Sequence, residues 1–239
     1  MPKAIVVGAS SGIGRAVAIR LAAHGYQVGL AGRRWELLEE VSQSLPQPSW
    51  VAALDLRESD AARKRFEQLV TEMDGVDLVV VSSGVGFLDE HERWESVATT
   101  LETNTLGFAA IADAAMRHFL AQGRGHLVGI SSVAAVRPSS HAPAYYASKA
   151  FVSNYLAGLR YHVRKKQLPI HVTDIRPGLV DTAMAQGEGL FWVAPPEAAA
   201  EQIVAAIERR RDVAYVTRRW RLIAILLRSM PDWLYRRIA

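Results

Sequence analysis

The chain has 239 residues, half of them hydrophobic and 22% charged, which is the balance of a folded globular protein rather than a disordered one. It contains no cysteine, so disulfides, thiolate metal sites and cysteine nucleophiles are excluded, and the composition fits a reducing cytoplasm. The net charge of +4 is unevenly placed, because residues 209–239 hold nine arginines and two aspartates while the rest is slightly acidic. A body without a basic face argues against a nucleic-acid partner.

Short apolar runs alternate along the chain with longer amphipathic segments. The runs predict strands over residues 4–7, 27–31, 50–54, 77–81, 125–130, 169–175 and 213–216. The amphipathic segments predict helices over residues 13–24, 35–45, 59–73, 104–122 and 145–166, and another that starts at residues 195–197. Strands that are apolar on both faces suit a parallel sheet with helices on each side. We therefore expect one α/β domain with a doubly wound, mostly parallel seven-stranded sheet of the Rossmann-like kind.

No targeting or membrane-spanning segment is evident in the sequence. The apolar run of residues 4–7 breaks at Gly8, which is too short for a signal peptide. No stretch approaches the roughly 20 apolar residues of a spanning helix. These features favour a cytoplasmic protein.

A glycine-rich loop separates the first predicted strand from the first predicted helix. Its glycines have the spacing Gly-x3-Gly-x-Gly. The first lets the chain turn sharply off the strand, and the others let backbone amides approach a pyrophosphate at the positive end of the helix. A tight strand–helix turn without a ligand is the alternative. The predicted phosphate-binding residues are Gly8, Ser10, Ser11, Gly12, Ile13 and Gly14.

The end of the second predicted strand distinguishes between two dinucleotides. An NAD site usually carries a carboxylate here for the ribose 2′-hydroxyl, whereas this strand runs into Arg33 and Arg34 with no acidic residue. Two guanidinium groups suit a 2′-phosphate, because each charge-assisted hydrogen bond contributes on the order of 1.5–3 kcal/mol. A solvated basic pair is the alternative, but the helix dipole disfavours positive charge at this end. The sequence therefore predicts NADP(H) as the cofactor.

A Tyr-x3-Lys pair opens the helix predicted over residues 145–166. Tyr145 and Lys149 are four residues apart and share one face. A nearby ammonium favours phenolate, so we expect Lys149 to lower the pKa of Tyr145 toward neutral, which suits a proton donor to a carbonyl. Ser132 ends the fifth predicted strand and could either orient a substrate oxygen or cap the following turn. Tyr-x3-Lys pairs also arise by chance, so this pair alone does not establish a site.

Together these motifs resemble the short-chain dehydrogenase/reductase family, in its classical NADP-preferring branch. The resemblance spans residues 3–217, in family order and spacing. Residues 1–217 would then form a Rossmann-like catalytic domain, and residues 218–239 a basic amphipathic tail of the same domain. The motifs that carry the resemblance are Gly8-x3-Gly12-x-Gly14, Asp55-Leu56, Asn104-x2-Gly107, Ser132, Tyr145-x3-Lys149 and Pro177-Gly178-Leu179-Val180-Asp181-Thr182.

The resemblance implies a role for each matching residue. Tyr145 would be the general acid/base, and Lys149 would lower its pKa and hold the nicotinamide ribose. Ser132 would position the reacting oxygen, and Asn104 would hold a water that relays protons to Lys149. The implied cofactor contacts are Asp55 and Leu56 at the adenine, Val180 and Thr182 on the nicotinamide side, and Gly84, Tyr145, Lys149, Pro177 and Gly178.

Two positions depart from the family pattern. The family's usual Asn-Asn-Ala-Gly after the fourth strand is Val81-Ser82-Ser83-Gly84 in this chain, so only Gly84 is carried over. The usual threonine before the first loop glycine is Val7, which removes one hydroxyl tie between loop and strand. Neither departure touches the proton chemistry.

Three segments would enclose the substrate: residues 133–144, the loop after Val85, and residues 183–194. Their side chains are mostly apolar, which predicts a hydrophobic ketone or aldehyde rather than a sugar. Gly187 and Gly189 flank Glu188, a pattern typical of a lid over the cofactor. The aromatic residues could equally pack under the following helix, and a lone loop histidine is more often solvated. The candidate wall residues are Phe87, Leu88, His141, Met184, Leu190, Phe191 and Trp192.

The tail of residues 218–239 mixes arginines with apolar and tryptophan residues. This pattern is typical of an interfacial helix attracted to anionic lipid. The alternative is that the apolar face packs on the protein's own body or on a neighbouring subunit, which the family's habit of forming dimers or tetramers favours. We therefore expect a homodimer or homotetramer, with membrane-surface contact as the less favoured possibility.

The function that these features predict is hydride transfer between NADP(H) and the carbonyl or alcohol carbon of an apolar small molecule, in the reduction direction. The alternative is a cofactor-sensing NADP(H)-binding protein without turnover, because a fold does not fix a function. All four proton-chemistry residues are present (Asn104, Ser132, Tyr145 and Lys149), which a sensor would not require. No metal site is expected.

Overall fold

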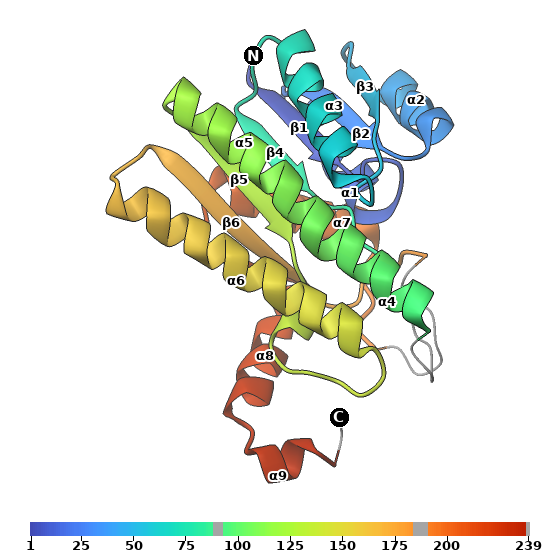
Figure 1. Ribbon diagram of the computed structural model, residues 1–239, viewed down its shortest axis with the longest axis vertical. Helices are drawn as coiled ribbons and strands as arrows, with labels where there is room; N and C mark the ends of the chain where they lie inside the picture. Colours follow the sequence, from blue (N-terminus) through green and yellow to red (C-terminus); the bar gives the residue numbers. More distant parts are fainter. Residues whose placement is uncertain (88–92, 184–190, 238–239) are drawn as a thin grey trace.

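The core of the computed structural model is a sheet of seven strands in the order β3-β2-β1-β4-β5-β6-β7, and the structure describes residues 1–87, 93–183 and 191–237. All neighbouring strands are parallel, which confirms the predicted doubly wound sheet (Figure 1). The strands are β1 (Lys3–Val7), β2 (Gln27–Gly32), β3 (Trp50–Ala53), β4 (Leu78–Val81), β5 (Gly125–Ile130), β6 (Ile170–Pro177) and β7 (Val213–Val216).

Helices cover both faces of this sheet. One layer contains α1 (Gly12–Ala23), α2 (Trp35–Ser44) and α7 (Pro196–Glu208), and the other contains α3 (Ser59–Glu72), α5 (Phe108–Gln122) and α6 (Pro143–Lys165). Two further helices, α8 (Trp220–Ser229) and α9 (Asp232–Tyr235), lie beyond the carboxyl ends of the strands (Figure 1). In the part of the chain that the structure describes, none of the helices combines the length and apolar character needed to span a bilayer.

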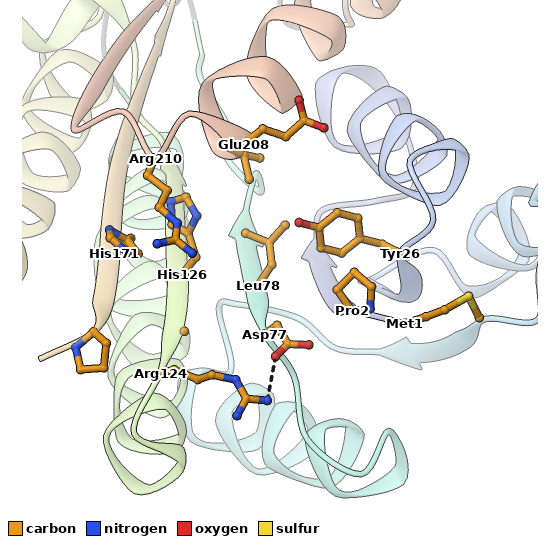
Figure 2. Close-up of a pocket in the computed structure, with 13 residues that line it drawn as sticks. Met1, Pro2, Tyr26, Asp77, Leu78, Arg124, His126, His171, Glu208 and Arg210 are labelled. Atoms are coloured by element: carbon orange, nitrogen blue, oxygen red, sulfur yellow. Dashed lines mark hydrogen bonds and ion pairs between the residues drawn. The ribbon is translucent and has the colours of Figure 1, made fainter.

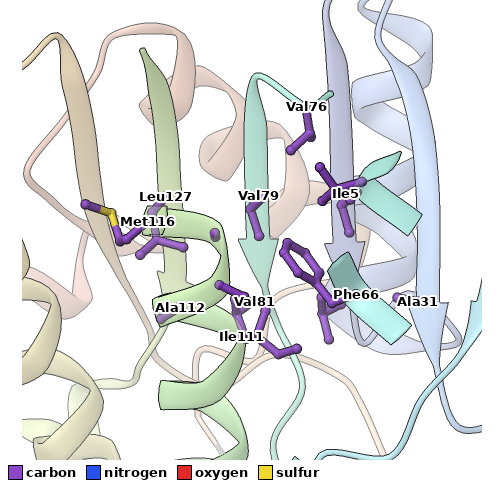
Figure 3. Close-up of a cluster of buried hydrophobic side chains, with 14 of the residues drawn as sticks. Ile5, Ala31, Phe66, Val76, Val79, Val81, Ile111, Ala112, Met116 and Leu127 are labelled. Carbon is purple, nitrogen blue, oxygen red and sulfur yellow. The ribbon is translucent and has the colours of Figure 1, made fainter. Parts of the chain in front are cut away.

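Strand β1 shows why the predicted strands are apolar at every position. Ile5 and Val7 pack in the layer of α3 and α5, whereas Ala4 and Val6 pack in the layer of α1 and α7, and all four are 0% exposed. In the first of these layers, Phe66 of α3 fills the space between helix and sheet (Figure 3). Burying an apolar side chain of this kind stabilises the fold by about 1.5–3 kcal/mol.

The chain changes direction across the sheet between β1 and β4. The register aligns Val7 with Ala31 on one side and with Val81 on the other, so the loops after these strands leave the same edge. Ligands of open α/β sheets bind outside the carboxyl ends of the strands at such a reversal. The fold therefore places the binding crevice beside Gly8 and Ser82.

The helix predicted over residues 104–122 is divided in the structure. Residues Glu102–Gly107 form a π-helical turn that contains Asn104, and α5 begins at Phe108. The preceding helix α4 (Trp94–Leu101) was not predicted, although Trp94, Val97 and Leu101 have helical spacing; Thr100 is its only buried residue. Helix α6 begins two residues earlier than expected, with Pro143 in its first turn, where proline is favoured.

Candidate active site

The glycine loop after β1 has no space for larger residues at its turns. Gly8 has a φ of +92° and Gly12 a φ of +54°, a backbone conformation that favours glycine. A Cβ on Gly14 would lie 2.1 Å from the carbonyl oxygen of Gly8, so α1 packs directly against the turn. The first turn of α1 therefore lies at the crevice, where its free amides suit a phosphate. This geometry fits a dinucleotide.

Arg34 connects the start of α2 to the glycine loop. Its Nη2 donates hydrogen bonds to the hydroxyls of Ser10 at 2.8 Å and Ser11 at 2.6 Å, and its Nε lies 3.2 Å from the Ser10 hydroxyl. Arg33 and Arg34 are both exposed. The structure thus brings together two guanidinium groups and two hydroxyls at the place where the sequence predicts a 2′-phosphate.

Asp55 and Leu56, the predicted adenine contacts, lie in different surroundings. Burial alone would raise the pKa of the Asp55 carboxyl, but hydrogen bonds with Arg57 outweigh burial and lower it, with a further contribution from the charge of Arg33. The side chain of Leu56 is 3% exposed and belongs to the hydrophobic core, while its carbonyl packs against Gly107. Asp55 therefore offers a polar side chain to a ligand, and Leu56 offers none.

Tyr145, Lys149 and Ser132 come together at the carboxyl ends of the strands. Tyr145 and Lys149 lie one turn apart near the start of α6, with the Lys149 Nζ 5.7 Å from the centre of the Tyr145 ring. The Lys149 Nζ also donates to the Ile130 carbonyl at 3.1 Å. Ser132 follows β5, and its hydroxyl donates to the Pro177 carbonyl at 3.5 Å and lies close enough to Tyr145 to act on the pKa of the phenol. The same Ser132 oxygen accepts from the Ala134 amide at 3.0 Å, so it also caps the next turn.

Burial has the largest effect on the pKa values of Tyr145 and Lys149. It raises the pKa of Tyr145 above its ordinary value, and the Ser132 hydroxyl opposes the effect. It also lowers the pKa of Lys149 to about 8, against the opposing charge of Asp174. The expected lowering of the Tyr145 pKa by Lys149 is therefore not what the structure shows. The ammonium lies near the ring, and burial favours the neutral form of both groups.

Asn104 holds the loop after β4 against α6. Its side-chain amide donates to the Val85 carbonyl at 2.7 Å and to the Ser148 hydroxyl at 3.0 Å, and its carbonyl accepts from the Val85 amide at 2.8 Å. A Cβ on Gly84 would lie 3.1 Å from the Lys149 Nζ, so this loop closes over the lysine. The Asn104 side chain thus has a positioning role through Val85 and Ser148. Its implied contact with a water stays a prediction.

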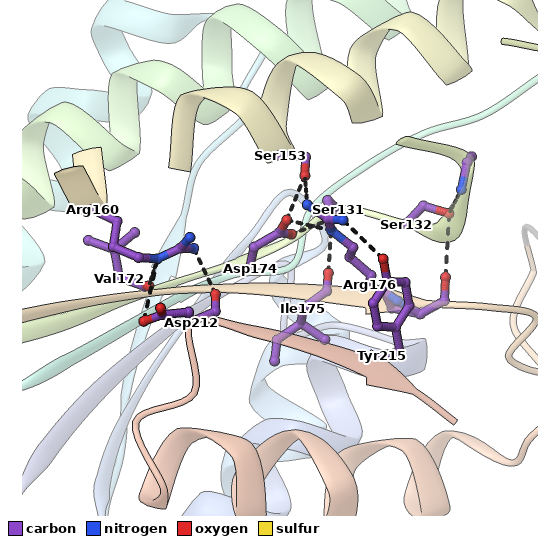
Figure 4. A network of polar contacts seen from close by, with 12 residues as sticks. Ser131, Ser132, Ser153, Arg160, Val172, Asp174, Ile175, Arg176, Asp212 and Tyr215 are labelled. Carbon is purple, nitrogen blue, oxygen red and sulfur yellow. Dashed lines mark hydrogen bonds and ion pairs between the residues drawn. The ribbon is translucent and has the colours of Figure 1, made fainter. Parts of the chain in front are cut away.

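A buried polar network under the site was not predicted. Asp174 of β6 is 0% exposed and accepts hydrogen bonds from the hydroxyls of Ser131 and Ser153 and from the Nε of Arg176 at 2.7 Å (Figure 4). Ser131 precedes Ser132, and Ser153 lies one turn after Lys149 on α6. The network therefore joins the two elements that carry the candidate catalytic residues. The available signal was a charged pair, Asp174 and Arg176, on the face of the strand that also carries Ile170 and Val172.

Residues 177–182 pass between the glycine loop and the C-terminal segment. Thr182 lies beside Gly12, where an added Cβ would be 3.0 Å from the Thr182 methyl. Val180 is 5% exposed and Pro177 is also buried. Gly178 packs against the ring of Trp220, which a Cβ would approach to 2.2 Å. The structure thus brings Thr182 to the glycine loop and explains Gly178 by its packing against Trp220.

Only some of the predicted pocket residues lie within the described chain. Phe87 is 40% exposed beside the site, and His141 is exposed in the loop before α6. The rings of Phe191 and Trp192 contact the ring of Trp220 at the start of α8, with centre-to-centre distances of 5.3 Å and 6.1 Å. The predictions for Leu88, Met184, Gly187, Glu188, Gly189 and Leu190 fall outside the described residues.

A separate cavity of about 520 Å³ lies at the opposite, amino edge of the sheet (Figure 2). It contains charged groups of both signs, including Arg124, which pairs with Asp77 at 3.4 Å. Burial lowers the pKa of His126, beside this cavity, to about 3. None of the predicted site residues lines it. Among the described residues, no cluster of three or more histidine, aspartate or glutamate side chains is arranged to hold a metal ion.

Comparison with known proteins connects this geometry to a family. A family model described as short chain dehydrogenase matches residues 2–190. An uncharacterized oxidoreductase of Myxococcus xanthus is 39% identical over 76% of this chain and 73% of its own length. An uncharacterized oxidoreductase of Mycobacterium tuberculosis is 34% identical over 99% and 97% of the two chains. A fatty acyl-CoA reductase of Acinetobacter baylyi is 30% identical over 96% and 80%.

Solved structures show the same fold at lower identity. A short-chain dehydrogenase of Sphingobium yanoikuyae in complex with NADPH has a TM-score of 0.83 at 22% identity and covers 97% of both chains. An alcohol dehydrogenase of Thermococcus sibiricus complexed with 5-hydroxy-NADP has a TM-score of 0.81 at 22% identity, over 90% of this chain and 95% of its own.

Proposed function

This chain belongs to the short-chain dehydrogenase family, and we propose that it is an NADP(H)-dependent reductase of apolar ketones or aldehydes. The observation that carries the proposal is the grouping of the Tyr145 phenol and the Ser132 hydroxyl with the buried Lys149. This arrangement provides a proton donor and a second hydroxyl at the carboxyl edge of the sheet, where ligands of open α/β folds bind beside the strand reversal. A structural core would not need such a set of hydroxyl and amine groups.

The choice of NADP(H) rests on Arg34 and its two hydroxyl partners. Ser10, Ser11 and Arg34 form a cluster of donors at the crevice, and Arg33 adds a second positive charge. Dianionic phosphate suits planar guanidinium donors, which a ribose hydroxyl does not require. The NADPH and 5-hydroxy-NADP named with the two structural neighbours agree with this choice. When bound, the nicotinamide group would supply or accept the hydride.

Tyr145 would donate the proton in the reduction direction. Its raised pKa keeps the phenol protonated near neutral pH, which is the state that a carbonyl reduction consumes. The Ser132 hydroxyl would orient the reacting oxygen beside the phenol. Lys149 has a pKa of about 8 and can therefore exchange a proton within the physiological range. We propose that Lys149 restores the proton to Tyr145 after each turnover.

The substrate would be apolar, because the described residues near the site are aromatic. Phe87, Phe191 and Trp192 are each more than a third exposed, so they are available to a ligand. The relative named fatty acyl-CoA reductase agrees with a hydrophobic substrate. We also propose a cytoplasmic homodimer or homotetramer. Its interface would use exposed side chains on the outer surfaces of α5 and α6, namely Leu120, Phe151 and Tyr161.

The experiment is NADPH oxidation, followed by absorbance, with a panel of apolar ketones, aldehydes and β-ketoacyl thioesters. A parallel set with NADH tests the cofactor preference. We expect turnover with NADPH favoured and with the more hydrophobic carbonyl compounds preferred. Tight NADPH binding with no oxidation across the whole panel would contradict the reductase and favour the cofactor sensor.

A further inference from the structure

Helix α8 has apolar side chains on two opposite faces. One face, with Trp220 and Ala224, is buried against the body of the protein at 6% and 0% exposure. On the opposite face, Leu222, Ile225 and Leu226 are 70%, 54% and 56% exposed. Their spacing of three and four residues places them in one stripe along the helix. A helix that is apolar on both sides is normally covered on both sides.

The exposed stripe belongs to a segment that is firmly attached. Arg137, in the loop after Ser132, donates hydrogen bonds from its Nε to the Leu227 carbonyl at 3.0 Å and from its Nη2 to the Met230 carbonyl. The Tyr235 hydroxyl donates to the Pro138 carbonyl, and Tyr235 is 8% exposed. These contacts hold α8 and α9 in place from both ends. The exposed apolar residues therefore form a fixed surface.

Exposed positive charge borders this apolar stripe. Arg221 and Arg228 are seven residues apart and lie along one side of it, and Arg218 precedes the helix; all three are exposed. Within residues 1–87, 93–183 and 191–237, none of these three guanidinium groups forms an ion pair. On α9, Trp233 is 65% exposed, with the guanidinium of Arg237 5.8 Å from the centre of its ring. The surface thus combines leucine, isoleucine and tryptophan with unpaired arginines.

We propose that α8 and α9 dock this protein on the surface of an anionic lipid membrane. A rim of cations around exposed apolar and tryptophan side chains matches the boundary between anionic headgroups and acyl chains. A second copy of the chain would be a poorer partner for this surface. Pairing the same surface twice would bring together two copies of residues 218–239, which each hold six arginines and one aspartate.

The position of the docking surface relative to the site agrees with this role. Figure 1 shows α8 and α9 beyond the carboxyl ends of the strands, on the side where α6 begins. Arg137 and Pro138, which hold the segment, lie in the same loop as the Ser132 turn. Docking would therefore place the site near the lipid surface. The docking itself does not depend on the proposed reductase activity.

The test is co-sedimentation of the full chain with vesicles of phosphatidylcholine alone or of phosphatidylcholine mixed with phosphatidylglycerol. We expect sedimentation with the mixed vesicles, little with phosphatidylcholine alone, and release at about 0.5 M salt, where surface charges are screened. A protein that stays in the supernatant with mixed vesicles would overturn the proposal. Equal binding to both kinds of vesicle would overturn the part that requires anionic lipid.

Variants inside and outside the docking surface test whether vesicle binding depends on this surface or on any exposed apolar side chain. Leu222→Ser/Leu226→Ser should weaken vesicle binding by about tenfold or more, because two exposed leucines lose their apolar contact. Arg221→Gln/Arg228→Gln should weaken binding to the mixed vesicles and reduce its salt dependence. The matched control is Trp94→Ser, which changes an apolar side chain of α4 that is 71% exposed and lies outside the segment, and it should bind as the parent does. Unchanged NADPH affinity reports that each variant is folded.

Sedimentation velocity without lipid tests the alternative that a second copy of the chain covers this surface. If Leu222→Ser/Leu226→Ser dissociates an oligomer and the parent ignores mixed vesicles, the surface is an interface between copies of the chain and the membrane proposal is wrong. If the oligomeric state is unchanged while vesicle binding is lost, the membrane proposal is supported.

Discussion

The candidate catalytic centre and the C-terminal segment lie at the same end of the sheet but differ in how their charged groups are partnered. At the centre, Lys149 is 5% and Asp174 0% exposed, and each has partners within the chain. In the segment, Arg221 and Arg228 are exposed next to exposed leucines. Buried charges require internal partners because desolvation is costly, whereas exposed apolar surface gains from an external one. The buried charges of the candidate centre therefore have partners within the chain, whereas the exposed segment would gain from an external surface.

Trp220 connects the two regions. Its ring packs on Gly178, in the segment that leads to Thr182 at the glycine loop, and stacks on Phe191 at 5.3 Å. It also begins α8, whose other face is exposed. Trp220 thus belongs to α8 and packs against the segment that leads to the glycine loop. Substitutions in each region test whether the two regions differ in the way that the burial of their charged and apolar side chains indicates.

The largest expected effect is on the buried network. Asp174→Asn should lower the free energy of unfolding by about 3 kcal/mol or more, because the guanidinium of Arg176 would remain buried beside a neutral partner. Denaturant unfolding measures this change. Asp113→Asn, which removes the charge of a more exposed pair with Arg117, should change stability by only about 0.5 kcal/mol. Similar losses in the two variants would contradict the distinction between buried and exposed charge.

The next effect concerns the choice of cofactor. Arg34→Gln should reduce the preference for NADPH over NADH by about 10- to 100-fold, which corresponds to the loss of one charge-assisted hydrogen bond. The readout is the ratio of kcat/KM for the two cofactors, and NADH serves as the internal control. If the ratio stays the same, Arg34 only fastens the glycine loop through Ser10 and Ser11.

A third prediction follows from the pKa of Lys149. This pKa lies at about 8, so the protonated form is lost as the pH rises through that value. Reduction consumes a proton, and its kcat/KM should therefore be level below pH 8 and fall by about tenfold per pH unit above it. The charge of Asp174 raises the Lys149 pKa, so Asp174→Asn should move the bend to lower pH. A profile that stays level to about pH 10 would contradict the proton path through Lys149.

The smallest expected effect is on the stability of the docking surface. Leu222→Ser/Leu226→Ser should change the free energy of unfolding by no more than about 0.5 kcal/mol, because both side chains are already exposed. Trp220→Ala, on the buried face of the same helix, should cost about 3 kcal/mol. A large loss in the leucine variant would mean that its side chains are buried in solution, in conflict with the free surface described above.

The sequence predicts the fold well because hydrophobic period is a local property. Continuous apolar runs such as residues 4–7 indicate strands buried on both faces, and glycine spacing indicates the turn into α1. Helix α4 was not predicted although its apolar residues have helical spacing, and it is only eight residues long. The division of the helix at residues Glu102–Gly107 also leaves no periodic mark.

Part of the candidate site can likewise be predicted from the sequence, and part of it cannot. The spacing of Tyr145 and Lys149 places both on one face of a helix, so their proximity can be predicted from the sequence. The Asp174 network depends on the register of β6 against β5 and on the packing of α6, which are long-range properties. The direction of the Tyr145 pKa shift depends on burial, which sequence spacing does not report. The contact between Gly178 and Trp220 joins residues far apart in the chain.

The most direct test of the catalytic centre compares the parent protein with Tyr145→Phe, using the best carbonyl substrate of the panel. We expect turnover to fall by about 100-fold or more, because the phenol hydroxyl acts on the substrate oxygen. The NADPH dissociation constant should change by less than about twofold. Turnover equal to that of the parent, with NADPH binding unchanged, would contradict the assignment of Tyr145 as the proton donor.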